Sequence, residues 1–290
     1  MNAFRCSDAA RTRGDAMLGT ASPASMWLLI ERSGAWPRRA LEAFEPALAA
    51  GLSAKAERHG ARVTLIRPPG RHPREDGGFR WAVADARPGH EGIRWHTSKD
   101  YREVVERDWR VSAGEGEPVA LVCSHSRHDV CCAVRGRPVA AAGDLVWPGR
   151  VWECSHVGGD RFAATVVLLP HGVNYGQVEP ADTARLLGMF ESGLVDPGHL
   201  RGRSSLSRVE QAAQGLALTA GLTSSVDGLR PELVDVATDG VITVVVSDPG
   251  VRIVFREVEV PLGTPATCHA VAPGIGREYQ LLSLERLPAA

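Results

Sequence analysis

The chain has 290 residues, 44% of them hydrophobic and 23% charged, so it is long enough to bury a core of its own. Its formal net charge of −1 argues against a protein that binds nucleic acid through charge. The longest apolar runs, 165–169 and 241–246, fall far short of the roughly 20 residues of a membrane helix, so we expect no membrane partner. The first residues lack the apolar stretch of a signal peptide, which predicts a cytoplasmic protein.

The first part of the chain predicts a small α/β unit. Residues 1–24 are polar and rich in glycine and alanine, and we expect them to form a loosely packed lead-in segment. Residues 25–113 alternate between buried-strand and helix patterns. The expected strands are 27–31, 61–68 and 80–86, and the expected helices are 40–58 and 98–109.

A second α/β unit is expected over 114–222, and no internal repeat is visible. Its order is strand, cysteine-containing loop, helix, strand, glycine-containing loop, two strands and helix, which is compatible with a thioredoxin-like fold. Residues 223–290 follow as an antiparallel meander of three strands, with an Asp-Gly turn at 239–240 and no recognisable chemistry. The sequence therefore predicts an α/β protein with a C-terminal β meander.

Cysteines are the most informative residues of the second unit. Four of the six cysteines lie between 123 and 154, and clustered cytoplasmic cysteines bind metal or do redox work more often than they form disulfides. Cys123 ends a buried strand, and Cys132 follows after eight intervening residues. His156 is separated by one residue from a Gly-Gly pair. Thiolates and imidazole suit soft or borderline metals, and strand carboxyl ends are where α/β proteins build sites.

The motif CSHSRHDVCCAVRGRPVAAA, followed by WECSHVGGDRFAATVVLLPHGVNYGQV, resembles the sucrase/ferredoxin-like family of thioredoxin-like [2Fe-2S] proteins. The resemblance extends to WLLIERSGAW and RGRSSLSRVEQAA, and it fades across the meander. The family pattern is two cysteines eight residues apart and a His-X-Gly-Gly-His loop, with two cysteines and two histidines as ligands. The resemblance therefore implies that Cys123, Cys132 and His156 bind a [2Fe-2S] cluster.

This chain departs from the family pattern at Asp160, which stands where the second histidine is expected. Either Asp160 ligates through oxygen, or Cys154 takes the vacant position. We favour Cys154, because iron–sulfur clusters are held mainly by thiolates and residues two apart on a strand face the same side. Asp160 would then accept a hydrogen bond from His156.

The choice of an anionic fourth ligand has a consequence for the reduction potential. Clusters with two histidines lie at roughly −150 to +300 mV, and all-cysteine plant ferredoxins lie at about −400 mV. An anionic ligand in place of one imidazole favours the oxidised form. We therefore expect a potential between these ranges, with a pH dependence that comes from His156 alone.

Three functions fit these residues. The first is a [2Fe-2S] electron carrier, rather than an enzyme, whose partners are a reductase and an acceptor protein. The second is a module stabilised by zinc, because two cysteines, a histidine and a fourth Cys or Asp also suit a tetrahedral zinc site. The third is a thiol oxidoreductase that uses Cys131 and Cys132, although these lack the C-X-X-C spacing.

Other polar residues near the motif have simpler interpretations. We expect Cys131 to be a bystander and Cys268 to be incidental. His125 and His128 belong to a polar loop, where we expect them to be solvated. Arg161 directly follows the loop of residues 156–160, called the ligand loop below, and could balance the negative charge of a cluster.

Overall fold

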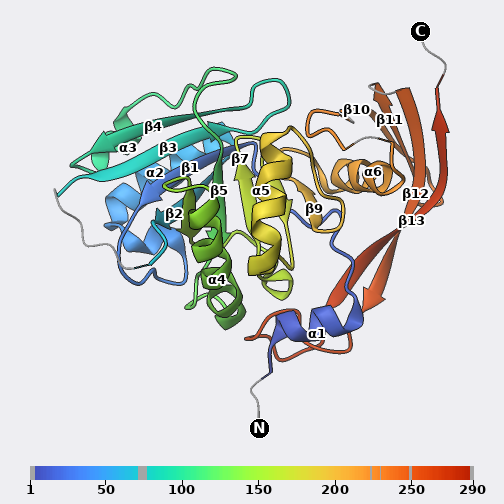
Figure 1. Ribbon diagram of the computed structural model, residues 1–290, viewed down its shortest axis with the longest axis horizontal. Coiled ribbons are helices and arrows are strands. Elements are labelled where there is room, and N and C mark those ends of the chain that lie inside the picture. The colour runs from blue at the N-terminus through green and yellow to red at the C-terminus, as the bar shows by residue number, and fades with distance from the viewer. Residues whose placement is uncertain (1–3, 71–76, 223, 229, 248–249, 288–290) are drawn as a thin grey trace.

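The computed structural model describes residues 4–70, 77–222, 224–228, 230–247 and 250–287 (Figure 1). The protein contains one nine-stranded sheet of order β4-β3-β1-β2-β6-β5-β7-β8-β9 and one four-stranded antiparallel sheet of order β10-β11-β12-β13. The expected α/β class with a C-terminal antiparallel meander is confirmed. No helix in the described part of the chain is long and apolar enough to cross a membrane.

The first unit begins with two parallel strands joined through a helix. Strands β1 (Met26–Glu31) and β2 (Ala61–Arg67) pair in parallel, and α2 (Pro46–His59), preceded by the short helix η1 (Ala40–Ala43), supplies the crossover that a parallel pair requires. Antiparallel strands β3 and β4 then extend the sheet on the far side of β1, before the short helix α3. Their bounds are β3 (Phe79–Asp85), β4 (Gly92–Ser98) and α3 (Arg102–Glu106).

The second unit repeats this topology. Strands β5 (Val119–Cys123) and β6 (Val151–Cys154) pair in parallel through α4 (Val130–Val146), and two antiparallel strands and a helix follow. The local orders β2-β1-β3-β4 and β6-β5-β7-β8 correspond strand for strand. Along the chain, the second unit has the order of strands and helices expected from the sequence. The remaining elements are η2 (Asp160–Phe162), β7 (Val166–Leu169), β8 (Val173–Tyr175), η3 (Pro180–Asp182), α5 (Thr183–Glu191) and β9 (Leu200–Arg203).

One short strand contact joins the two units into a single sheet. Strands β2 and β6 run antiparallel and pair only where Ile66 faces Cys154 and Arg67 faces Glu153. Because both pairs lie at the carboxyl ends of their strands, the loops that follow the parallel strands of the two units meet there. That edge is where α/β proteins bind ligands.

The C-terminal part packs against the same core. Helix α6 (Arg208–Thr219) lies between β9 and the meander (Figure 1), and the inner residues of the meander share an apolar cluster with α4, α5 and α6. The meander has four strands rather than the expected three, because the last segment pairs along the long strand before it. The strands are β10 (Pro231–Val236), β11 (Val241–Ser247), β12 (Gly250–Pro261) and β13 (Ile275–Arg286).

The lead-in segment differs from the expectation that it is loosely packed. It forms helix α1 (Cys6–Arg13), in which Cys6, Ser7 and Ala10 are buried. This helix lies beside the loop between β12 and β13, at the opposite end of the chain (Figure 1). Its small buried residues give a weak hydrophobic pattern, and its partner lies too far along the chain to be found from local sequence.

The start of α4 lies against the end of β5. A Cβ atom built on Gly136 would collide with the backbone carbonyl oxygen of Cys123, so only glycine allows this approach. The same approach brings Cys132, one turn earlier on α4, next to Cys123.

Replacing Gly136 by alanine tests this contact. We expect Gly136→Ala to destabilise the metal-free protein by about 1–3 kcal/mol, because a backbone carbonyl cannot move aside as a side chain can. Gly188→Ala is the matched control, since Gly188 is also helical but has no atom near its added Cβ. The control should stabilise the protein by about 0.5–1 kcal/mol. Urea unfolding measures the change in unfolding free energy of both variants. Equal changes in Gly136→Ala and Gly188→Ala would contradict the proposed packing.

Candidate metal centre

Three of the side chains implied by the sequence converge at the shared edge of the two units. Cys123 ends β5, Cys132 lies in the first turn of α4, and His156 follows β6 after one intervening residue. Their ligand atoms all lie within 4.8 Å of one another. The two cysteines are 2% and 3% exposed, so the sulfur atoms are shielded from water while the histidine reaches toward the surface.

A carboxylate and a second imidazole adjoin these three residues. Asp160 is buried, and its Oδ1 lies 3.3 Å from Cys132 Sγ and 3.0 Å from His156 Nδ1. The His128 ring stacks on the His156 ring with the centroids 3.6 Å apart. His128 Nε2 lies 3.7 Å from Asp160 Oδ2. The site thus offers two thiols, two imidazoles and a carboxylate.

Cys154, the fourth ligand that the sequence argument favoured, lies beside Cys123 in the sheet. It pairs in register with Cys123 on the neighbouring strand and is fully buried. It packs in the same apolar cluster as Cys123 and Cys132. Its sulfur does not belong to the three-residue group of Cys123, Cys132 and His156.

His125 is not solvated as expected, and His128 is only partly exposed. His125 is 3% exposed, and its Nδ1 accepts a hydrogen bond from the backbone N–H of His156 at 3.2 Å. The loop after β1 covers His125, and the Trp36 ring packs edge-on against it with the ring centroids 5.8 Å apart. Because this cover comes from the other unit, the local sequence of the cysteine loop could not reveal it.

The charges of the site favour a thiolate beside an imidazolium in the metal-free protein. The hydrogen bond from Cys132 and the neighbouring His156 lower the pKa of the Cys123 thiol despite its burial. Burial lowers the pKa of His156, but Asp160 and Cys123 outweigh it and raise that pKa to about 9. Burial alone would raise the pKa of Asp160, yet His156 keeps it below its usual value.

Two arginines, the partly buried Arg62 and the buried Arg201, donate hydrogen bonds to the ligand loop. Arg62 Nη2 donates to the carbonyl of His156 at 2.9 Å, and Arg201 Nη1 donates to the carbonyl of Gly158 at 2.9 Å. Arg201 is 1% exposed, and burial lowers its pKa to about 10. The sequence analysis missed both arginines. Arg161, the cation it singled out, lies 3.2 Å from the carboxylate of Asp15 instead.

The residues present fit a metal-containing group. Thiols and imidazole are ligands for iron and zinc, and the buried Nδ1 of His156 makes no aligned hydrogen bond. Gly158 and Gly159 have φ values of 93° and 80°, and a Cβ on Gly159 would collide with the Arg201 guanidinium. The glycines therefore let the ligand loop turn sharply against its supporting cation.

Comparison with known protein families gives a match to this chain. A family model described as sucrase/ferredoxin-like matches residues 17–202. This segment contains Cys123, Cys132, His156 and Asp160, and it ends within β9. No curated protein matches the chain, and no solved structure matches it.

The pairing of Asp160 with His156 can be tested in the metal-free protein. We expect Asp160→Asn to lower the pKa of His156 from about 9 toward its ordinary value, because the imidazolium loses a neighbouring anion. Histidine titration by NMR measures this shift. Glu153→Gln removes a nearby carboxylate that pairs with Arg67 instead, so it should leave the pKa of His156 unchanged. An unchanged pKa in Asp160→Asn would contradict the pairing.

Proposed function

Because the chain belongs to the sucrase/ferredoxin-like family, we propose that it binds a [2Fe-2S] cluster and carries single electrons between a reductase and an acceptor protein. The observation that carries this proposal is the convergence of Cys123, Cys132 and His156 within 4.8 Å. Iron–sulfur clusters are held by cysteine thiolates, which imidazole replaces in some of them. Such a cluster, when bound, supplies a reversible one-electron couple.

The contacts favour Asp160 as the fourth ligand. Its Oδ1 lies 3.3 Å from Cys132 Sγ and 3.0 Å from His156 Nδ1, so it already adjoins two of the three other ligands. Cys154 is the better iron ligand by chemical type, but its sulfur lies outside the three-residue group. Asp160 also stands in the position where the family pattern has its second histidine.

Charges around the site influence the reduction potential in opposite directions. Arg62 and Arg201 place positive charge against the ligand loop, which favours the reduced state because reduction adds negative charge. Asp160 is anionic where the family has a neutral imidazole, which favours the oxidised state. We keep the expectation of a potential between those of two-histidine and all-cysteine clusters.

A redox partner has one evident direction of approach. His125, His128 and His156 line a cavity of about 980 Å³ together with Arg38 and Arg62. Electrons would pass between the histidine side of the site and a protein seated over this cavity. The cavity wall also contains Arg39, Glu42 and Glu57, so its charges are mixed and do not select the charge of a partner.

A zinc-stabilised module is the second candidate function. Two thiols, an imidazole and a carboxylate lie close together, as a tetrahedral zinc site requires. A thiol oxidoreductase function has less support, because the adjacent Cys131 and Cys132 contact different residues. Cys131 Sγ lies 3.3 Å from Cys268 Sγ, whereas Cys132 Sγ lies 3.3 Å from Asp160.

Absorption spectra of two adjacent cysteine variants test the carrier proposal. Protein purified without oxygen should be brown and should partly bleach with dithionite. Cys132→Ser should be colourless because it loses a ligand, while Cys131→Ser should keep the colour because its thiol faces elsewhere. A wild-type protein that stays colourless after anaerobic reconstitution with iron and sulfide would contradict the carrier proposal and favour the zinc-stabilised module.

The fourth ligand can be tested through the reduction potential. We expect Asp160→His to raise the midpoint potential toward the range of two-histidine clusters, roughly −150 to +300 mV, and to add a second imidazole-linked ionisation. Cys154→Ser, the matched substitution on β6, should leave the potential nearly unchanged. Spectroelectrochemistry over a range of pH measures both. Loss of the cluster in Cys154→Ser would instead identify Cys154 as the ligand.

A further inference from the structure

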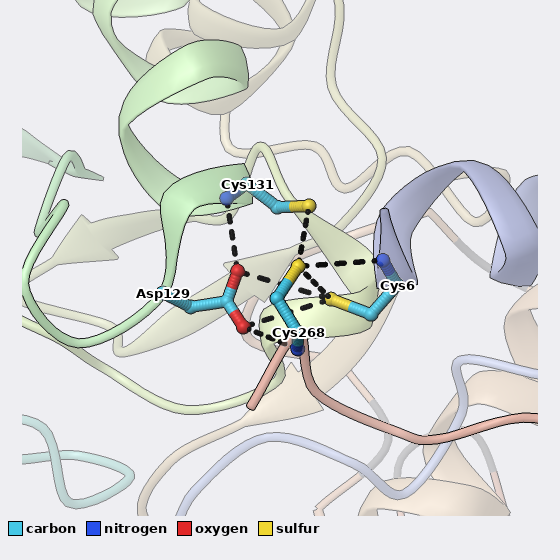
Figure 2. Close-up of side chains that lie close together, drawn as sticks. All are labelled: Cys6, Asp129, Cys131 and Cys268. Carbon is cyan, nitrogen blue, oxygen red and sulfur yellow. Dashed lines mark hydrogen bonds between the residues drawn. The ribbon is translucent and has the colours of Figure 1, made fainter. Parts of the chain in front are cut away.

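A second group of cysteines lies beside the candidate metal centre and is not used by it. Figure 2 shows Cys6, Asp129, Cys131 and Cys268 with their side chains directed toward one another. Cys6 begins α1, Asp129 and Cys131 lie at the start of α4, and Cys268 lies in the loop between β12 and β13. The four ligand atoms all lie within 4.8 Å of one another.

The thiols of this group are close together and shielded from water. Cys131 Sγ lies 3.3 Å from Cys268 Sγ, and Cys6 Sγ lies 3.5 Å from Cys268 Sγ. Cys6, Asp129 and Cys131 are buried, and Cys268 is partly exposed. The fold brings Cys131 and Cys268 together across 137 positions of sequence, a contact that the sequence analysis did not expect.

We propose that these four residues form a tetrahedral zinc site with three thiolate ligands and one carboxylate ligand. With zinc–sulfur bonds of about 2.3 Å, the sulfur atoms of a tetrahedral site lie about 3.8 Å apart. The two sulfur–sulfur distances found here differ from that value by only a few tenths of an ångström. Cys6 Sγ lies 3.8 and 3.9 Å from the two carboxylate oxygens of Asp129.

Asp129 holds the ligands in place before any metal binds. Its Oδ1 accepts a hydrogen bond from the Cys131 backbone N–H at 2.9 Å, and its Oδ2 accepts one from the Cys268 backbone N–H at 2.8 Å. Each carboxylate oxygen retains a lone pair for a metal. The N-terminus of α4 also favours the negative charge of the thiolates.

Binding is an exchange of protons for metal and involves no electron transfer. The zinc ion replaces the three thiol protons, which pass to solvent, and Asp129 contributes its existing negative charge. The closed set of four protein ligands is typical of structural rather than catalytic zinc. The ion would tie α1 and the loop between β12 and β13 to the first turn of α4, directly beside Cys132. This site is independent of the proposed electron-carrier function.

Metal analysis of single-cysteine variants separates the two sites. Full-length protein purified without oxygen should contain roughly one zinc ion per chain besides its iron. Cys268→Ser should lose this zinc and keep the iron and its colour, which also shows that the variant is folded. Cys132→Ser should lose the iron and keep the zinc. Should the first site bind zinc instead of iron, the wild type would contain two zinc ions and each variant would lose one.

A milder variant and a thiol-protection assay test the zinc site even if a cysteine-to-serine variant fails to fold. Asp129→Asn keeps an acceptor oxygen for the helix terminus but removes the charge, so it should weaken zinc affinity about 10–100-fold in competition with a chelating dye. In the wild type, Cys268 should resist alkylation until a chelator removes the zinc. Absence of zinc from wild-type protein after equimolar zinc is added would overturn the proposal. So would full retention of zinc by Cys268→Ser, or a Cys131–Cys268 disulfide in the anaerobic protein.

Discussion

The short antiparallel contact between β2 and β6 determines where the chemistry of this protein lies. Only Ile66, Arg67, Glu153 and Cys154 take part in it, and all four stand at the carboxyl ends of their strands. The contact places the loops after β1 and β5 against each other. As a result, Trp36 of the first unit covers His125 of the second, and the ligand loop is enclosed by both units. Neither unit alone would provide this environment.

Close backbone approach then sets the ligand positions within the second unit. Gly136 lets α4 touch the end of β5, which brings Cys132 to Cys123. The ligand loop is fixed by Arg62 and Arg201, which donate to its carbonyl groups and supply the positive charge that two thiolates and Asp160 require. The same first turn of α4 directs Cys131 toward Cys6 and Cys268, whereas Cys132 Sγ lies 3.3 Å from Asp160. One helix start therefore serves two groups of cysteines with different chemistry.

The sequence predicted those parts of the site that depend on local pattern. Cys123 and Cys132 flank one loop between a buried strand and a helix, and His156 follows the next strand. This order indicated a site at the end of the sheet, and the family resemblance implied these three residues as its ligands. The α/β order of the second unit was predictable from local pattern as well. The repeat of that order in the first unit was not, because it lies in strand topology and leaves no visible sequence repeat.

Features that depend on distant packing were not predictable. The burial of His125 comes from the other unit, and the meeting of Cys6 with Cys268 joins segments from opposite ends of the chain. Strand alternation predicted that Cys154 and His156 face the same side, but it could not show that Asp160 lies 3.3 Å from Cys132 Sγ and 3.0 Å from His156 Nδ1.

Electron paramagnetic resonance of the dithionite-reduced wild-type protein, combined with iron and sulfide analysis, tests the central claim most directly. The account predicts roughly two iron and two sulfide ions per chain. It also predicts a single unpaired electron shared by those irons, in a signal that is absent from the oxidised protein. A protein that contains zinc at Cys123, Cys132 and His156, with neither sulfide nor a signal after anaerobic reconstitution, would contradict it.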